Sequence, residues 1–188
     1  PIAVAKKYTG ISASLVAHIK NTRTPFSIDF GVGDVIVPKQ EKRKIPTQLD
    51  DFASPTINTY SLETTIAEKL DAILDLMEFS SRMKDYYDIY YLANKFDFDG
   101  ATLTKSLKKT FENRGHAFTI EQFEQVMAFA ENDAMQKKWK AFCRKIDTKT
   151  DTFSKVIETI NLFLAEPIKA AESTAFTAHW TASENEWK

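Results

Sequence analysis

The spacing of the hydrophobic residues changes once along this chain, and that change restricts the folds that it can adopt. In Ile11–Lys20 the odd positions are all apolar and the even positions are mostly polar, which is typical of a half-buried strand. Phe26–Phe30 alternates in the same way, and Val35–Val37 is a third short apolar run that ends at Pro38. The turn residues between these runs predict an antiparallel meander.

From residue 61 onward the apolar residues recur every three or four positions, which indicates amphipathic helices. Ser61 is a good N-cap for the first helix and Thr119 for the fourth, and Pro167 is expected to end the last one. The expected helices span about 61–77, 82–94, 103–115, 119–130, 134–145 and 152–165. Strands followed by a multi-helix bundle predict the α+β class rather than alternating βαβ units.

This order of elements divides the chain into three expected parts. Residues 1–55 form a β-rich part that ends in a polar linker, and residues 56–168 form a helical domain. Residues 169–188 lack periodicity and are expected to be a flexible tail. A short sheet in the first part would expose an edge, through which a second copy could pair to form a homodimer.

Composition and motif spacing exclude several classes of protein. A net charge of −1 gives no global basic field that would attract nucleic acid. A single cysteine excludes an internal disulfide and a multi-cysteine zinc site, and the glycines form neither a GxGxxG motif nor a P-loop. A catalytic metal would therefore be held by carboxylates, as magnesium and manganese are. No apolar run approaches the ~18 residues of a membrane span, so we expect a cytoplasmic protein.

Charged residues occupy two helical positions where apolar residues are expected. Lys69 lies at the margin of the apolar stripe of the first helix, and Asp85 lies on the inner stripe of the second, one turn before Asp88. A lysine at such a margin extends to solvent, pairs with an acid or contacts a ligand. The two acids need a cation, which Lys69, Arg82 or Lys84 could supply. An interhelical Lys69–Asp85 salt bridge is as consistent with the pattern as a functional site.

Three further features admit more than one interpretation. Asp29 lies on the polar face of the second strand, where an acid is usually just solvated unless that face lines a cleft. The helix at Met135–Ile146 combines basic residues with Trp139 and Phe142, which suits either a phosphate backbone or an ordinary solvated helix. The basic cluster at 39–44 is equally an RNA contact or a plain linker.

An E-x-x-x-x-E-K helix and a later R-x-K-D-x-x-D motif follow one another within Tyr60–Ile73 and Ser81–Tyr90. The residues that carry these motifs are Glu63, Glu68, Lys69, Arg82, Lys84, Asp85 and Asp88. The two stretches closely resemble the AbiEii/AbiGii abortive-infection toxin family of nucleotidyltransferases. The I-D-F-G sequence around Asp29 resembles the last core strand of that family. The resemblance covers about residues 8–95, and the later helices fit the family only loosely.

That resemblance implies a DNA-polymerase-β-like nucleotidyltransferase, with the short sheet as a remnant of its core. Such enzymes transfer a nucleoside monophosphate from an NTP to an acceptor, using Mg²⁺ held by carboxylates. Lys69 would grip the triphosphate, Asp85 would orient or deprotonate the acceptor hydroxyl, and Asp29 would be the third acid of the metal site. Nucleotide-binding roles are implied for Lys69, Glu68, Arg82, Lys84 and Asp88.

The resemblance also implies partners. Toxins of this family are linked to a block of translation, in some members by adding nucleotides to the tRNA 3′ end. The acceptor is therefore expected to be tRNA or another RNA. The antitoxin is expected to be encoded nearby, to act at the promoter and to form no stable complex with the toxin.

The chain departs from the family pattern upstream of Asp29, where a G-S turn and a D-x-D strand are expected and not found. Asp97-Phe98-Asp99 has that spelling but is interpreted as a loop. We therefore expect the C-terminal part of a longer enzyme or an inactive relative, without transferase activity from this polypeptide alone. The main alternative is a non-catalytic helical module that binds nucleotide, RNA or a protein partner. A metal-dependent nuclease using Glu68-Lys69 fits poorly, because adjacent helix residues diverge by about 100°.

Overall fold

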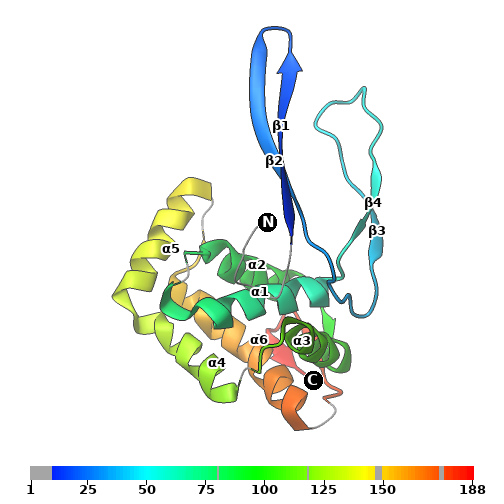
Figure 1. Cartoon of the computed structure of the whole chain (residues 1–188). Coiled ribbons are helices and arrows are strands. Elements are labelled where there is room, and N and C mark those ends of the chain that lie inside the picture. The colour runs from blue at the N-terminus through cyan, green and yellow to red at the C-terminus, as the bar shows by residue number, and fades with distance from the viewer. Residues whose placement is uncertain (1–9, 80, 118, 147–149, 174–175) are drawn as a thin grey trace. The chain divides into compact units, whose positions relative to one another are not determined.

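The computed structural model describes residues 10–79, 81–117, 119–146, 150–173 and 176–188. The chain separates into two compact units, Pro1–Val35 and Ile36–Lys188. Helices combined with small antiparallel sheets confirm the α+β class (Figure 1). The division predicted after residue 55, into a β-rich part and a helical domain, stays a prediction.

The first unit contains a β-hairpin in which β1 (Ile11–Ile19) pairs antiparallel with β2 (Thr22–Phe30). The two predicted strands are confirmed, and β2 begins earlier than the alternation suggested. The odd residues of β1 lie opposite the even residues of β2, so one face of the hairpin is apolar over most of its length. The large exposed side chains of this apolar face are Ile11, Leu15, Ile19, Phe26, Ile28 and Phe30.

The third predicted strand, Val35–Val37, is wrong, and the expected meander is a two-stranded hairpin. In a strand, the backbone of Val37 would form hydrogen bonds with a neighbouring strand. Here it binds side chains at the start of helix α1 (Leu62–Leu76) instead. The Val37 N–H donates to Thr64 Oγ1 at 2.9 Å, and Ser61 Oγ donates to the Val37 carbonyl at 2.5 Å. These bonds fasten the entry of the second unit onto α1.

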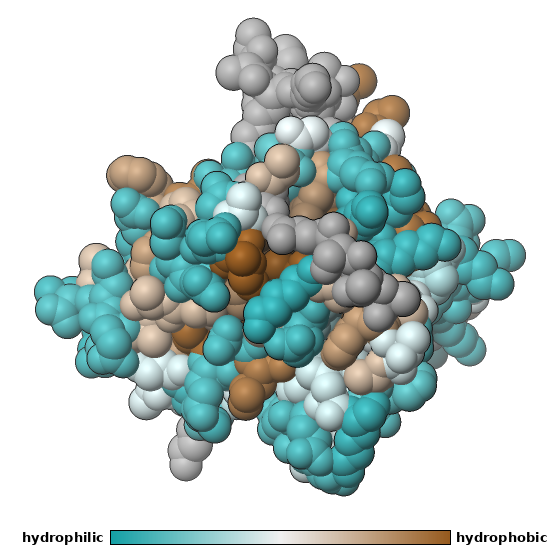
Figure 2. All heavy atoms as spheres, turned by 90° about the horizontal axis from the view of Figure 1, so that it is seen from below, coloured by the Kyte–Doolittle hydropathy of each residue, from teal (hydrophilic) through white to brown (hydrophobic). Residues whose placement is uncertain are grey.

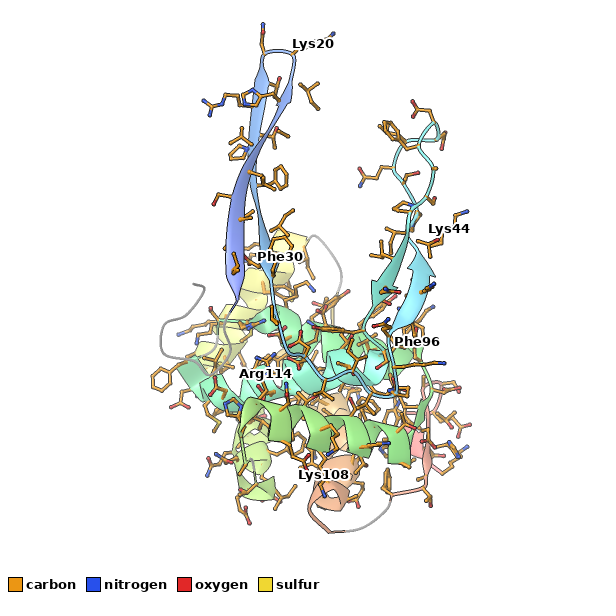
Figure 3. All side chains as sticks on the ribbon, turned by 45° about the vertical axis from the view of Figure 1, so that its right-hand side comes forward. Lys20, Phe30, Lys44, Phe96, Lys108 and Arg114 are labelled. Carbon is orange, nitrogen blue, oxygen red and sulfur yellow. The ribbon has the colours of Figure 1, made fainter. Side chains whose placement is uncertain are left out.

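The predicted linker contains a second hairpin, formed by β3 (Glu41–Lys44) and β4 (Thr56–Thr59). Lys44, labelled in Figure 3, ends β3 on an arm that extends away from the helices. Most side chains of this pair are exposed, so its sequence has no apolar alternation. Hydrophobic periodicity therefore gave no signal for it.

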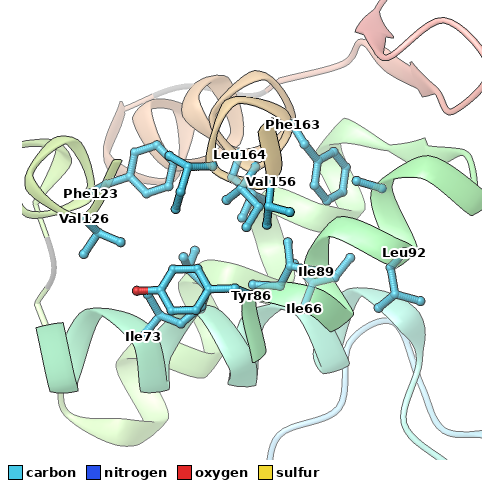
Figure 4. Close-up of a cluster of buried hydrophobic side chains, with 14 of the residues drawn as sticks. Ile66, Ile73, Tyr86, Ile89, Leu92, Phe123, Val126, Val156, Phe163 and Leu164 are labelled. Carbon is cyan, nitrogen blue, oxygen red and sulfur yellow. The ribbon is translucent and has the colours of Figure 1, made fainter. Parts of the chain in front are cut away.

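The second unit is built around helices that bury their apolar faces against one another (Figure 4). They are α1, α2 (Met83–Lys95), α3 (Gly100–Arg114), α4 (Ile120–Met127), α5 (Asp133–Ile146) and α6 (Phe153–Ser173), with 3₁₀ turns η1 (Met77–Phe79) and η2 (Ala128–Glu131). Helices α1 and α6 each pack against both α2 and α3. The predicted helices are confirmed, and Ser61 and Thr119 cap α1 and α4 as expected.

Helix α6 continues through Pro167 instead of ending before it. Proline has no N–H to bond the carbonyl four residues earlier, which here belongs to Phe163. Trp187 Nε1 donates to that carbonyl at 3.1 Å and replaces the missing bond. A side chain from another segment therefore satisfies the helix at its proline.

The segment expected to be a flexible tail has regular structure. Helix α6 reaches Ser173, and β6 (His179–Thr181) pairs with both β5 (Phe98–Asp99) and β7 (Glu186–Trp187). Trp180 is 1% exposed, and its Nε1 donates to the Ala93 carbonyl at 2.7 Å. The tail prediction failed because two short strands and one buried tryptophan give no periodic pattern.

Candidate functional site

Five charged residues meet where α1 and α2 pack together, and we call them the lysine–aspartate cluster. Lys69 Nζ of α1 lies 3.0 Å from Asp85 Oδ1 and 2.6 Å from Asp88 Oδ2 of α2. Arg82 Nε lies 2.7 Å from the other oxygen of Asp85. Lys84 Nζ lies 2.5 Å from the Asp88 oxygen that Lys69 also contacts. The interhelical Lys69–Asp85 salt bridge is confirmed.

The local sequence explains why these side chains meet. Ser61 fixes the start of α1, and burial of Ile66, Leu70 and Ile73 sets the face that α1 turns to the body. Lys69 follows at the margin of that face, beside α2. Asp85 lies in the first turn of α2, where the helix dipole favours an acid.

Burial and charge differ strongly across the cluster. The Asp85 side chain is 4% exposed and that of Lys69 is 20% exposed, whereas those of Arg82 and Lys84 are 58% and 70% exposed. Burial alone would lower the pKa of Lys69, but Asp88 and Asp85 outweigh it and raise that pKa above its usual value. Lys69 is therefore an ammonium ion at any physiological pH.

The cluster combines three cations with two carboxylates, so its net charge is +1. An ammonium group has three N–H donors, and the two carboxylates engage two of those of Lys69. Among the described residues nothing else engages Lys69 Nζ, so one donor is open to an anion beside the exposed ends of Arg82 and Lys84. The arrangement is chemically suited to hold a phosphate group.

Two of the predicted site residues lie elsewhere. Glu68, for which a nucleotide-binding role was implied, has a side chain that is 14% exposed and pairs with Arg114 of α3. Asp29 belongs to the first unit, where it lies on β2 opposite Ser12. The pairing of Glu68 therefore ties α1 to α3, whereas Lys69 contacts α2, and Asp29 is described only within the first unit.

The expected Mg²⁺ site is not built by the described residues. Among them, no group of three or more His, Cys, Asp or Glu side chains is placed to hold a metal ion. Asp29, the expected metal ligand, lies on an exposed strand. The described residues by themselves do not form a complete site for the ion, so we derive no step through it.

A second charged cluster ties α1 to the end of α3, and the sequence analysis missed it. His116 Nδ1 lies 2.8 Å from Asp71 Oδ1, and His116 Nε2 lies 3.8 Å from Asp75 Oδ1. Arg114, labelled in Figure 3, pairs with Glu68 one turn earlier on α1. Burial raises the pKa of Asp71, while the contact with His116 opposes that rise. The acids at 68, 71 and 75 form a helical stripe that could have signalled this cluster.

The aromatic residue Trp139 of the basic helix α5 agrees with the interpretation of α5 as an ordinary solvated helix. Trp139 is 3% exposed, packs on Phe153 with ring centroids 5.7 Å apart and donates to the Asp151 carbonyl. Its ring therefore belongs to the core and is not an exposed stacking platform.

The Asp97-Phe98-Asp99 sequence also has structural roles. Asp99 caps α3 by accepting from the Thr102 N–H at 2.8 Å, and Asp97 accepts from the Ala182 N–H at 2.9 Å. The interpretation as a loop was wrong in detail, because Phe98–Asp99 forms the short strand β5.

Comparison with known proteins gives one match. A family model described as nucleotidyl transferase AbiEii toxin, type IV TA system, matches residues 1–166. No curated protein and no solved structure matches the chain. The matched range contains the hairpin with Asp29 and both helices of the lysine–aspartate cluster, and it extends well past residue 95 into α6.

Proposed function

The chain belongs to the AbiEii nucleotidyl transferase toxin family of type IV toxin–antitoxin systems, and from that premise we propose that its lysine–aspartate cluster binds the phosphates of the transferred nucleotide. The observation that carries the proposal is the placement of Lys69 between Asp85 and Asp88. A half-buried ammonium ion held by two acids keeps one orientation and one charge. That is what a fixed contact to a polyphosphate requires.

Each cation has a separate part in this proposal. Lys69 donates its remaining N–H to a phosphate oxygen, which makes a charge-assisted hydrogen bond. Arg82 and Lys84 reach from the exposed start of α2 and neutralise further phosphate charge. Asp88 accepts from both lysines and holds them close to each other.

Asp85 has two roles in this proposal: it first positions Lys69, and it then contacts the acceptor hydroxyl. Both its oxygens contact cations, and its side chain is almost fully buried. When phosphates draw the exposed Arg82 toward themselves, the Asp85 oxygen that it contacts becomes available to orient or deprotonate the acceptor hydroxyl.

The reaction that we propose transfers a nucleoside monophosphate from an NTP to an acceptor, with tRNA or another RNA as the acceptor. Nucleotidyltransferases typically use a divalent metal, and Mg²⁺ is the ion that we propose. Asp29 would be one of the ligands of this ion. The described residues contain no group of three or more metal-ligating side chains that would supply the others. Glu68 would act indirectly, through its pairing with Arg114.

The partners follow from the family. A toxin–antitoxin family implies an antitoxin, which we propose acts without a stable complex. Among the described helices, none has the length and apolarity of a membrane span. The face seen in Figure 2 is largely hydrophilic. We propose a cytoplasmic protein, with a homodimer formed through the exposed hairpin.

Nucleotide binding tests the cluster directly. A fluorescent NTP analogue is titrated into the wild-type chain, into Lys69→Ala and into the control Lys109→Ala. Lys109 has an exposed pairing with Glu112, so its loss removes the same charge away from the cluster. We expect Lys69→Ala to weaken binding about tenfold or more, because a charged hydrogen bond is lost, and Lys109→Ala to bind as wild type. Equal binding by all three would refute the proposal.

The paired state of both Asp85 oxygens favours a second candidate, a non-catalytic module that binds nucleotide, RNA or a protein partner. Incubation with labelled NTPs, Mg²⁺ and total tRNA separates the two candidates. Incorporation that disappears in Lys69→Ala supports the transferase. NTP binding that depends on Lys69, without incorporation by the full-length natural protein, supports the module.

A further inference from the structure

A cavity of about 490 Å³ lies between α5 and the start of α6, on residues that the proposed function does not use. We call it the α5–α6 cavity. Its volume lies within the ~300–1,000 Å³ of typical small-molecule sites. One wall is a single stripe of α5, and the other is the segment that enters α6. The lining consists of Gln136, Trp139, Lys140, Cys143, Arg144 and Thr150–Ser154.

Many polar groups of the lining are bound within the protein. Cys143 Sγ lies 2.8 Å from Thr150 Oγ1, and Ser154 Oγ donates to the Ala130 carbonyl at 3.1 Å. The Asp151 carboxylate accepts from the Tyr90 hydroxyl of α2. These bonds hold the walls in place, so the cavity does not depend on a ligand for its shape.

The two cations of the lining differ from these groups. Lys140 and Arg144 are both exposed, and neither has an ion-pair partner among the residues that the structure describes. They lie four residues apart on α5, so their side chains are neighbours on one face. Asp151 is the acid of the described lining, which leaves a net charge of +1. The walls therefore present positive charge without an ion-pair partner among the described residues, beside a volume that is partly open to solvent.

The floor of the cavity is apolar. Trp139 and Phe153 are 3% and 2% exposed, and their rings pack against each other. The lining thus combines two exposed cations with two aromatic side chains that are almost fully buried. Arginine matches phosphate with a planar pair of donors, and lysine adds a point charge.

We propose that the α5–α6 cavity binds an organic phosphate of nucleotide size, with the phosphate on Lys140 and Arg144 and the organic part in the volume between α5 and the start of α6. The shared chemistry is that of a nucleoside phosphate, supplied either as a free mononucleotide or as the terminal nucleotide of an RNA. None of the lining residues belongs to the lysine–aspartate cluster. The proposal is therefore independent of the proposed function.

Cys143 provides a local probe, because it is the only cysteine of the chain and it lines the cavity. Its alkylation by iodoacetamide is followed by intact mass, with AMP, with adenosine or with a short RNA present. At about ten times the Kd of AMP the free fraction of the site falls about tenfold, and the alkylation rate falls with it. Adenosine lacks the phosphate and should protect far less. Equal protection by adenosine and AMP would overturn the phosphate assignment.

Matched double variants test the two cations. Lys140→Ala/Arg144→Ala should abolish protection by AMP. Lys137→Ala/Lys145→Ala removes the same charge from exposed positions of the same helix outside the lining, and should keep protection. Equal loss in both variants would show general attraction of anions and overturn the proposal. Stronger protection by RNA than by AMP identifies an RNA end as the ligand, and the reverse identifies the free nucleotide.

Equilibrium dialysis with labelled AMP gives a second measurement that does not depend on the thiol. We expect one bound equivalent in the wild-type chain, and the same in the control Lys137→Ala/Lys145→Ala, whose changed residues lie outside the lining. Binding should be lost in Lys140→Ala/Arg144→Ala. No bound AMP at millimolar concentration in the wild-type chain would overturn the proposal, whatever the reactivity of Cys143.

Discussion

At the scale of single residues, the stability of the protein depends on the ion pairs of the lysine–aspartate cluster. Lys69 is half-buried, and removing either Asp85 or Asp88 would leave an ammonium ion with fewer partners in a place that water only partly reaches. Breaking such a pair costs more than breaking a solvated one, because the remaining charge keeps its desolvation penalty.

A double-mutant cycle measures this coupling. With Lys69→Met and Asp85→Asn, singly and together, we expect a coupling free energy of about 1–2 kcal/mol from urea unfolding. The exposed Lys109–Glu112 pair, changed to Met and Gln, should give less than about 0.5 kcal/mol. Equal coupling energies in the two cycles would contradict the burial argument.

Tyr90 gives a prediction about pH. Burial, followed by the hydrogen bond to Asp151, raises the pKa of Tyr90 to about 12. The folded state therefore keeps this proton where the unfolded state, with a pKa near 10, loses it. The stability that Tyr90 contributes is fully present below about pH 10 and is lost as the pH rises toward 12.

Tyr90→Phe removes that titration. Urea midpoints of the wild-type chain and the variant, compared at about pH 8 and about pH 11, should converge or cross, because only the wild type loses this contribution. The paired comparison cancels the titration of the lysines, which both chains share. A difference that is the same at both pH values would refute the prediction.

At the scale of elements, the sequence predicted those parts that carry a periodic apolar face. The helices and the β1–β2 hairpin have such faces, and their positions were predicted closely. Val35–Val37, the β3–β4 hairpin and the course of α6 past Pro167 depend on partners distant in sequence, such as Ser61 for Val37 and Trp187 for Phe163. A local pattern contains no information on those partners.

The contacts of the candidate site also fall into those that the sequence could indicate and those that it could not. A contact of Lys69 with Asp85 was one of the alternatives that the sequence offered, because helix geometry places both residues at apolar stripes. The pairing of Glu68 with Arg114 was missed, because α1 and α3 are neighbours only in the folded unit. The free cations and volume of the α5–α6 cavity likewise exist only after packing.

Helix α6 supplies a prediction at this scale. Trp187→Phe keeps an aromatic ring but removes the donor to the Phe163 carbonyl, which should cost about 1–3 kcal/mol of unfolding free energy. In a Pro167→Ala background the new N–H at position 167 can bond that carbonyl, so the same substitution should cost less. Urea unfolding of the four chains provides the check. Equal costs in both backgrounds would show that the tryptophan does not replace the proline's missing bond.

At the scale of the whole molecule, the two units differ in how much apolar surface they bury. The buried hydrophobic residues described all lie in the second unit, from Val37 onward. The first unit keeps an apolar face exposed on a two-stranded hairpin, a structure that is marginal by itself in water.

Removal of the first unit should therefore leave the second intact. We expect residues 36–188 to unfold cooperatively with a Tm within about 4 °C of the full chain, since less than ~1 kcal/mol should be lost. Calorimetry of both chains tests this. A larger fall in Tm would mean that the hairpin supports the helical body.

The exposed apolar face of the hairpin also predicts association between copies. The full chain at high concentration should sediment faster than a monomer, and Ile28→Asp should reverse this because it places a charge on that face. Ser27→Asp adds the same charge to the opposite face and should not. A monomer at all concentrations in the wild-type chain would contradict the proposed homodimer.

The buried Trp180 has a consequence for the timing of synthesis. Its hydrogen bond joins it to Ala93, 87 residues earlier, and its ring packs on Phe163 of α6. On a ribosome that adds about 5–20 residues each second, α1 to α5 emerge seconds before the residue that closes this end of their core. Until then, the apolar surface that Trp180 buries stays exposed on the nascent chain. The helical body is therefore complete only after Trp180 has left the ribosomal exit tunnel.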